Sequence, residues 1–205
     1  MPDPAPYRTL SAPCGPFELK EKKSKFIGWA FPAASAGEAG DHIASLRSRY
    51  ADATHVCHAF RIGTDQPVVR MSDDGEPAHS AGAPILHQIE AAGLYNVVVA
   101  VVRYYGGTNL GVGGLIRAYR EAARGCLEEA RVVTRTPHAI LTLDFQYPVL
   151  GAVMRFISQH RLEIRDQQME LACSVTIRVP LHALPEIRSG IAALGQVQIR
   201  EETRY

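Results

Sequence analysis

The sequence predicts an α+β protein of two domains, and three observations carry this prediction. Strand-like apolar runs alternate with helical patterns over 205 residues, a length that suits one large domain or two small ones. The second half follows a strand, helix, strand, strand, helix, strand order, the βαββαβ arrangement called ferredoxin-like. The segment RVVTRTP at 131–137 is the predicted linker between the two domains. We therefore expect domains at 1–134 and 138–205.

The first strands and helix of the N-terminal half are marked by a charged turn and a helix cap. Residues 17–20 and 25–31 have strand character, and the charged turn EKKS lies between them. Ser35 and Glu38 form a capping-box pattern. We therefore expect a helix from this point to about Tyr50.

The rest of the N-terminal half combines regular elements with a long loop. A strand at 55–62 leads into residues 63–84, whose Gly, Pro, Asp and Ser content predicts a loop. A short helix is expected at 84–92. Residues 97–102 are continuously apolar, which indicates a strand covered on both faces. A second long helix is expected at 113–130.

The C-terminal half shows more regular periodicity. Pro148 suits the first turn of a helix, and Gly195 suits the end of one. Two neighbouring strands separated by a few polar residues indicate a hairpin. The expected elements are strand 138–147, helix 148–160, strands 162–167 and 173–179, helix 184–194 and strand 197–201.

Composition and charge narrow the classes of function. The formal net charge is +1, so the chain as a whole is not strongly basic, although a local basic patch remains compatible with this value. Its four cysteines form no C-x-x-C pair and suit a reducing, cytoplasmic setting. The first residues lack a secretory signal pattern, and the apolar run at 97–102 is too short to cross a bilayer. We expect a cytoplasmic protein without membrane contact.

The segment VVVAVVRYYGGTNLGVGGLIRAYR at 97–120 joins an apolar strand to a helix through five glycines. It matches neither the dinucleotide fingerprint, because Ile116 replaces the third glycine, nor the P-loop, because it lacks lysine. Free backbone N–H groups at a helix start still favour an anion, and tyrosines can stack on bases. The alternative is that the glycines allow close packing and positive φ. The candidate anion or nucleic-acid site comprises Arg103, Tyr104, Tyr105, Gly106, Gly107, Asn109, Gly111, Gly113, Gly114 and Arg117.

Four arginines on the expected helix or directly after it fall on one face: Arg117, Arg120, Arg124 and Arg131. They form either a stripe for phosphates or a solvated face with ion pairs. Arg117 with Glu121 and Arg124 with Glu128 have i,i+4 spacing. This spacing favours the solvated, paired face.

A cluster of acidic residues and histidines forms a secondary candidate site. Strand alternation puts His55 and Cys57 on one face and His58 on the other. Carboxylates in the segment MSDDGEPAHSAGAPIL at 71–86 suit either a divalent cation or a capped, solvated turn, and we favour the turn. A zinc site or a Cys–His nucleophilic pair lacks the recognised spacings, so no metal is expected. The secondary site comprises His55, Asp73, Asp74, Glu76 and His79.

Three segments together resemble the YigZ/IMPACT family over essentially the whole chain. They are ADATHVCHAF at 51–60, SDDGEPAHSAGAPIL at 72–86 and VVVAVVRYYGGTNLGVGGLIRAYREA at 97–122. The resemblance implies a first domain with the βαβ fold of elongation factor G domain IV and a second domain similar to its domain V. It also implies nucleic-acid binding or action around the ribosome for bacterial members. Eukaryotic members restrain the starvation-responsive kinase that controls translation initiation.

One position departs from the family pattern. Ala83 stands where a basic residue is common, which removes a charge from the acidic loop. The glycine segment is unaffected.

The family resemblance, together with the cluster of arginine, tyrosine and glycine residues, implies a non-enzymatic cytoplasmic factor linked to the regulation of translation. RNA or the ribosome is the expected partner, and we expect no cofactor and no catalytic residues. Two alternatives stay open. One is a regulator that binds a protein and no RNA. The other is a hydrolase that uses the loop 73–79 with His55 or Cys57.

Overall fold

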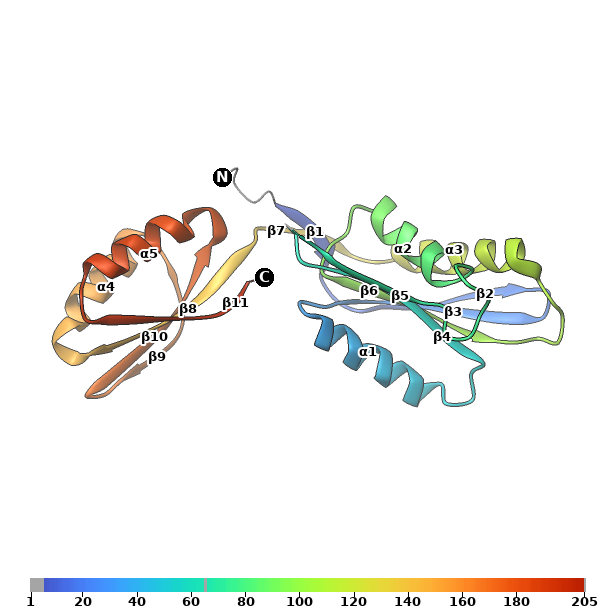
Figure 1. The fold of residues 1–205 in the computed structure, drawn as a ribbon, viewed down its shortest axis with the longest axis horizontal. Helices are drawn as coiled ribbons and strands as arrows, with labels where there is room; N and C mark the ends of the chain where they lie inside the picture. Colours follow the sequence, from blue (N-terminus) through green and yellow to red (C-terminus); the bar gives the residue numbers. More distant parts are fainter. Residues whose placement is uncertain (1–5, 65, 205) are drawn as a thin grey trace. The chain divides into compact units, whose positions relative to one another are not determined.

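The computed structural model describes residues 6–64 and 66–204 and confirms the α+β class. Its strands and helices divide into two compact units, residues 7–135 and residues 136–204 (Figure 1). Each unit has its own hydrophobic core.

The N-terminal unit is built on a five-stranded antiparallel sheet with the order β2-β3-β6-β4-β5. Helix α1 covers one face of the sheet, and helices α2 and α3 cover the other (Figure 1). The elements are β2 (Cys14–Glu21), β3 (Ser24–Pro32), α1 (Ala36–Arg49), β4 (His55–Ile62), β5 (Val68–Ser72), α2 (Gly82–Ala91), β6 (Val97–Tyr104) and α3 (Gly111–Glu128).

Strand β6 lies at the centre of the sheet, as its continuous apolar run predicts. Alternate side chains enter the cores on opposite faces, because neighbouring residues of a strand point in opposite directions. Val97, Val99 and Val101 pack under α2 and α3, whereas Val98, Ala100 and Val102 face α1. All six side chains are fully buried.

Three short strands were not expected from the sequence. Strand β5 lies inside the segment 63–84 that was predicted as a continuous loop, so this prediction was wrong there. Strands β1 (Tyr7–Leu10) and β7 (Val132–Arg135) pair with each other, and β7 occupies most of the segment expected as a linker. Strands of four or five residues show too little alternation to be detected. The strands β1 and β7 also lie far apart in the sequence, whereas β5 pairs with the preceding strand β4.

The C-terminal unit has the predicted βαββαβ order, and its four-stranded antiparallel sheet has the order β11-β8-β10-β9. Helices α4 and α5 contribute their apolar faces to a core with the sheet. Short 3₁₀ turns precede both helices. The elements are β8 (His138–Gln146), α4 (Leu150–Gln159), β9 (Glu163–Met169), β10 (Ala172–Pro180), α5 (Leu184–Ala193) and β11 (Val197–Arg204).

The register of the N-terminal sheet brings the two unusual segments to one end. His55 at the start of β4 pairs with Arg103 near the end of β6, and His58 pairs with Ser72 at the end of β5. The acidic loop follows β5 and the glycine segment follows β6. Both loops therefore leave the sheet at the same end.

Candidate functional site

Asp73 organises the acidic loop and caps helix α2. Its carboxylate accepts backbone N–H groups from His79 at 2.8 Å, Ala81 at 3.0 Å and Gly82 at 2.8 Å. Burial opposes ionisation, but these hydrogen bonds outweigh it and lower the pKa of Asp73 below its ordinary value of 3.8. The carboxylate of Asp73, bound by three backbone donors, therefore stabilises the loop, as expected if this segment is a turn capped by Asp.

We expect Asp73→Ala to lower the free energy of unfolding by about 1–2 kcal/mol at pH 7, because it leaves the start of α2 uncapped. Since the folded pKa is depressed, the wild type loses this contribution as pH falls below 3.8 and through the folded value. The difference between the two proteins should therefore shrink at pH 3. Urea unfolding followed by the fluorescence of Trp29 measures it, with the exposed Asp41→Ala as control. An equal cost at both pH values would contradict the assignment.

Asp74 is also held by protein groups. Burial disfavours its charge, but a 2.6 Å hydrogen bond from Arg47 and another from the backbone N–H of Val56 lower its pKa. The backbone carbonyl of Asp74 lies 2.7 Å from Nδ1 of His55. The loop is thus tied to both α1 and β4.

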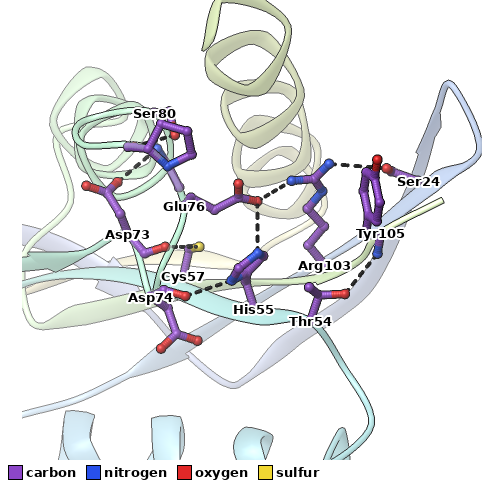
Figure 2. Close-up of polar contacts among 12 residues, drawn as sticks. Ser24, Thr54, His55, Cys57, Asp73, Asp74, Glu76, Ser80, Arg103 and Tyr105 are labelled. Carbon is purple, nitrogen blue, oxygen red and sulfur yellow. Dashed lines mark hydrogen bonds and ion pairs between the residues drawn. The ribbon is translucent and has the colours of Figure 1, made fainter. Parts of the chain in front are cut away.

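Glu76 is the centre of a buried polar network (Figure 2). Its Oε1 accepts from Nη1 of Arg103 at 2.5 Å and from the hydroxyl of Tyr119 at 2.7 Å, and it lies 3.9 Å from Nε2 of His55. The side chains of Glu76 and Arg103 are only 4% and 6% exposed. Arg103 also donates to the hydroxyl of Ser24. The charge of Arg103, expected at the anion site, is therefore already balanced by Glu76.

Cys57 faces the same network as His55, as strand alternation predicts (Figure 2). Its thiol donates to the carbonyl of Asp73 at 3.0 Å, and its sulfur lies 3.3 Å from the hydroxyl of Tyr119, which donates to Glu76. Burial raises the pKa of Cys57 far above its ordinary value. The thiol stays protonated at neutral pH, and a protonated thiol is a poor nucleophile.

The two tyrosines after β6 have different environments. Tyr104 donates to Asp52 at 2.7 Å, and this hydrogen bond raises the pKa of Tyr104. Tyr105 is 46% exposed, and its ring lies 5.4 Å from the guanidinium of Arg103. Its hydroxyl donates to Asn109 at 3.2 Å. Tyr105 therefore offers an open aromatic face, whereas the hydroxyl of Tyr104 is engaged.

The glycines of the segment have separate roles. Gly106 packs directly on the β2–β3 turn, where an added Cβ would overlap the backbone carbonyl of Lys23. Gly107 and Gly111 adopt φ values of +79° and +71°, which favour glycine. Gly113 has open space where a Cβ would lie. Close packing explains Gly106, and conformation explains Gly107 and Gly111.

Helix α3 begins without a side-chain cap. The N-cap residue Leu110 provides no hydrogen bond, and the first turn carries no acidic residue. Gly111 and Gly113 are exposed, and Gly114 is half-buried. The first N–H groups of a helix have no intrahelical acceptors, so this start favours an anion.

The structure adds two lysines to the residues singled out from the sequence. Lys22 and Lys23 form the exposed β2–β3 turn with φ values of 43° and 69°. The backbone of this turn lies against Gly106. The charged EKKS sequence was the available signal, but the contact of Lys23 with Gly106, 83 positions later, could not be predicted from it.

Arginines on α3 differ in their pairing. Arg124 pairs with Glu121 at 2.5 Å and with Glu128 at 3.0 Å. This confirms the Arg124–Glu128 pair, whereas within the described residues Glu121 bonds to Arg124 and not to Arg117. Arg117 is exposed one turn after Gly113.

Within residues 6–64 and 66–204, no group of three or more His, Cys, Asp or Glu side chains is placed to hold a metal ion. His79 is exposed, and its backbone N–H donates to Asp73. No helix in the described ranges is long and apolar enough to span a membrane.

Comparisons with known proteins agree with this arrangement. The model of the Impact N-terminal domain matches residues 22–127. A protein from Thermus thermophilus, named "IMPACT family member in pol 5'region", is 40% identical over 78% of this chain and 86% of its own. "IMPACT family member YigZ" of Escherichia coli (strain K12) is 31% identical over 91% of this chain and 95% of its own. A crystal structure of a hypothetical protein covers 95% of this chain and 96% of its own, with 29% identity and a TM-score of 0.72. The chain therefore belongs to the IMPACT family.

Proposed function

We propose that this chain is a non-enzymatic, cytoplasmic factor that regulates translation by binding RNA or the ribosome. The binding surface, here called the lysine–glycine surface, comprises Lys22, Lys23, Tyr105, Gly106–Gly114 and Arg117. The translation role is supported by membership of the IMPACT family, whose eukaryotic members act on translation initiation. The choice of surface is supported by the geometry described above.

The contact between Gly106 and the β2–β3 turn is the observation that carries the proposal. It holds the turn that carries two exposed lysines against Gly106, five residues before the uncapped helix α3 begins. Lysines neutralise phosphates, and helix N–H groups donate to them. Tyr105 adds an exposed ring on which a base can stack. Together these groups suit a polyanion with exposed bases better than a single free nucleotide.

The secondary site supports a structural role over hydrolysis. The carboxylates of Asp73 and Asp74 accept backbone N–H groups, and Glu76 accepts from Arg103 and Tyr119. A general base or a metal ligand needs lone pairs that are free to act. In Asp73, Asp74 and Glu76, these hydrogen bonds already occupy most of the lone pairs.

We expect the full chain to bind a structured RNA hairpin, with an affinity that falls as salt rises because phosphate contacts release counterions. The double variant Lys22→Gln, Lys23→Gln should weaken binding at low salt. It should also reduce the slope of log affinity against log salt by about 1–2, roughly one unit per lost phosphate contact. Fluorescence anisotropy at several salt concentrations measures both quantities.

Arg124→Ala is the matched control, since this arginine is exposed but paired with two glutamates. It should leave RNA affinity close to that of the wild type. Unchanged binding in the double lysine variant would remove the lysine–glycine surface from the proposal. Capture of one protein partner without any RNA affinity would favour the protein-binding alternative, and turnover of ATP would contradict the non-enzymatic assignment.

A further inference from the structure

Two of the four cysteines contact each other where helix α3 packs on strand β2. Cys14 is the first residue of β2, and Cys126 lies in the last turn of α3, 112 residues later. The thiol of Cys14 donates to the carbonyl of Cys126 at 3.4 Å, and the thiol of Cys126 donates to the carbonyl of Cys14 at 3.7 Å. Each sulfur atom therefore lies against the other cysteine.

Two glycines allow the backbones of α3 and the sheet to approach closely at this point. A Cβ added to Gly125 would overlap the ring of Phe17. A Cβ added to Gly28 would lie 2.6 Å from the carbonyl oxygen of Ala122 and 3.0 Å from Cβ of Cys126. A disulfide joins Cα atoms that are only roughly 4.4–6.8 Å apart. The close approach of helix and sheet suits this requirement.

The two thiols differ in their access to solvent. Cys126 is fully buried, whereas Cys14 is half-buried. Burial raises the pKa of Cys126 far above its ordinary value, and the adjacent thiol of Cys14 raises it further through its charge and a hydrogen bond. The thiol of Cys126 therefore stays protonated at neutral pH while Cys14 is reduced. An oxidant dissolved in water reaches Cys14 first.

We propose that Cys14 and Cys126 are a modification site, at which a hydroperoxide converts the two thiols into a reversible disulfide. The Cys14 thiol releases its proton, and its sulfur attacks one oxygen of the peroxide. The O–O bond breaks, Cys14 becomes a sulfenic acid, and the other oxygen leaves with the released proton as water or an alcohol. The sulfur of Cys126 then attacks the sulfur of Cys14. The S–O bond breaks, and the departing hydroxide takes the proton of Cys126 and leaves as water.

The balance of this reaction is complete with the peroxide alone. Two thiols lose two electrons and two protons, and hydrogen peroxide is reduced to two molecules of water. A dithiol reductant reverses the modification by thiol–disulfide exchange. Disulfides that form in a reducing compartment are usually transient and respond to oxidants. The inference does not depend on RNA binding, because the lysine–glycine surface lies at the opposite end of β2.

Peptide mapping of the oxidised full chain tests the proposal. The reduced protein is treated with a small excess of hydrogen peroxide, its remaining thiols are alkylated, and it is digested with trypsin without reduction. We expect one cross-linked species that joins peptides 9–20 and 125–131 and has lost two hydrogen atoms. The midpoint of urea unfolding, followed by the fluorescence of Trp29, should rise by at least about 1 M, because the bond restricts the unfolded chain over a long loop. Dithiothreitol should reverse both changes.

Two variants receive the same peroxide treatment. Cys14→Ser should show neither the cross-link nor the rise in midpoint, and its midpoint before treatment shows whether it is folded. Cys173→Ala is the matched control, because this buried thiol bonds to the carbonyl of Glu170 in the other unit. It should form the cross-link as the wild type does.

Three results would overturn the proposal. The first is a folded wild type in which Cys14 and Cys126 remain alkylated, or in which Cys14 is oxidised without a cross-link. The second is a cross-link that forms only in urea, since it would then not depend on the folded contact. The third is a cross-link between two chains, which a non-reducing gel separates from the disulfide within one chain.

Discussion

Replacing Arg103 with methionine should lower the free energy of unfolding of the N-terminal unit by about 3–5 kcal/mol, because it leaves the buried carboxylate of Glu76 without its cation. The two side chains are almost completely buried, so water cannot replace the lost partner. Urea unfolding of the full chain at pH 7 measures the change. Trp29, the single tryptophan of the chain, is buried in the N-terminal unit, so its fluorescence reports that unit alone.

Two further variants distinguish the loss of the buried Arg103–Glu76 pair from the general effect of removing an arginine. Arg124→Ala removes an exposed arginine with two ion pairs and should cost about 0–1 kcal/mol. Adding Glu76→Gln to Arg103→Met removes the stranded charge but keeps an acceptor for Tyr119, so it should restore much of the lost stability. A single Arg103→Met variant as stable as Arg124→Ala would show that the network contributes little.

Gly106→Ala should destabilise the same unit by about 1–3 kcal/mol, as expected when an atom is forced into a closely packed site. The added Cβ would overlap backbone atoms of Lys23 and Ser24, so either the β2–β3 turn or the glycine segment must move. Because the turn carries the lysines, we also expect weaker RNA binding. Urea unfolding and fluorescence anisotropy on the same preparations give both values.

Gly113→Ala is the matched control from the same segment. No atom lies within 4 Å of its added Cβ, and its φ is not positive. Alanine inside a helix is favoured over glycine by roughly 0.5–1 kcal/mol, so this variant should be unchanged or slightly more stable. If Gly106→Ala and Gly113→Ala behaved alike, the contact with the lysine turn would not be what requires glycine at position 106.

Local patterns predict the elements that are long enough to show a period. The central strand β6 was recognised because six apolar residues in succession need cover on both faces. The C-terminal unit was recognised because its helices and strands alternate with clear boundaries. Strands β1, β5 and β7 were missed because four or five residues show too little alternation, and β1 and β7 also pair across most of the N-terminal unit.

In the candidate sites too, local patterns predict some contacts, whereas others depend on the folded sheet. Strand alternation correctly placed His55 and Cys57 on one face. The pairing of Arg103 with Glu76 could not be predicted, since it depends on how a loop folds back over a strand 27 residues later. The proximity of Lys23 to Gly106 was likewise invisible, because both belong to turns whose positions are set by the sheet.

The pairing of β1 with β7 has a consequence for the order in which the chain folds during its synthesis. Ser11 hydrogen-bonds to the carbonyl of Arg131, 120 residues later, and Leu10 beside it is fully buried in the core. The first strand therefore leaves the ribosome long before its partner is made. Contacts this distant in sequence slow folding, because the intervening chain must be ordered first. The N-terminal unit can complete its fold only when synthesis has already reached the start of the C-terminal unit.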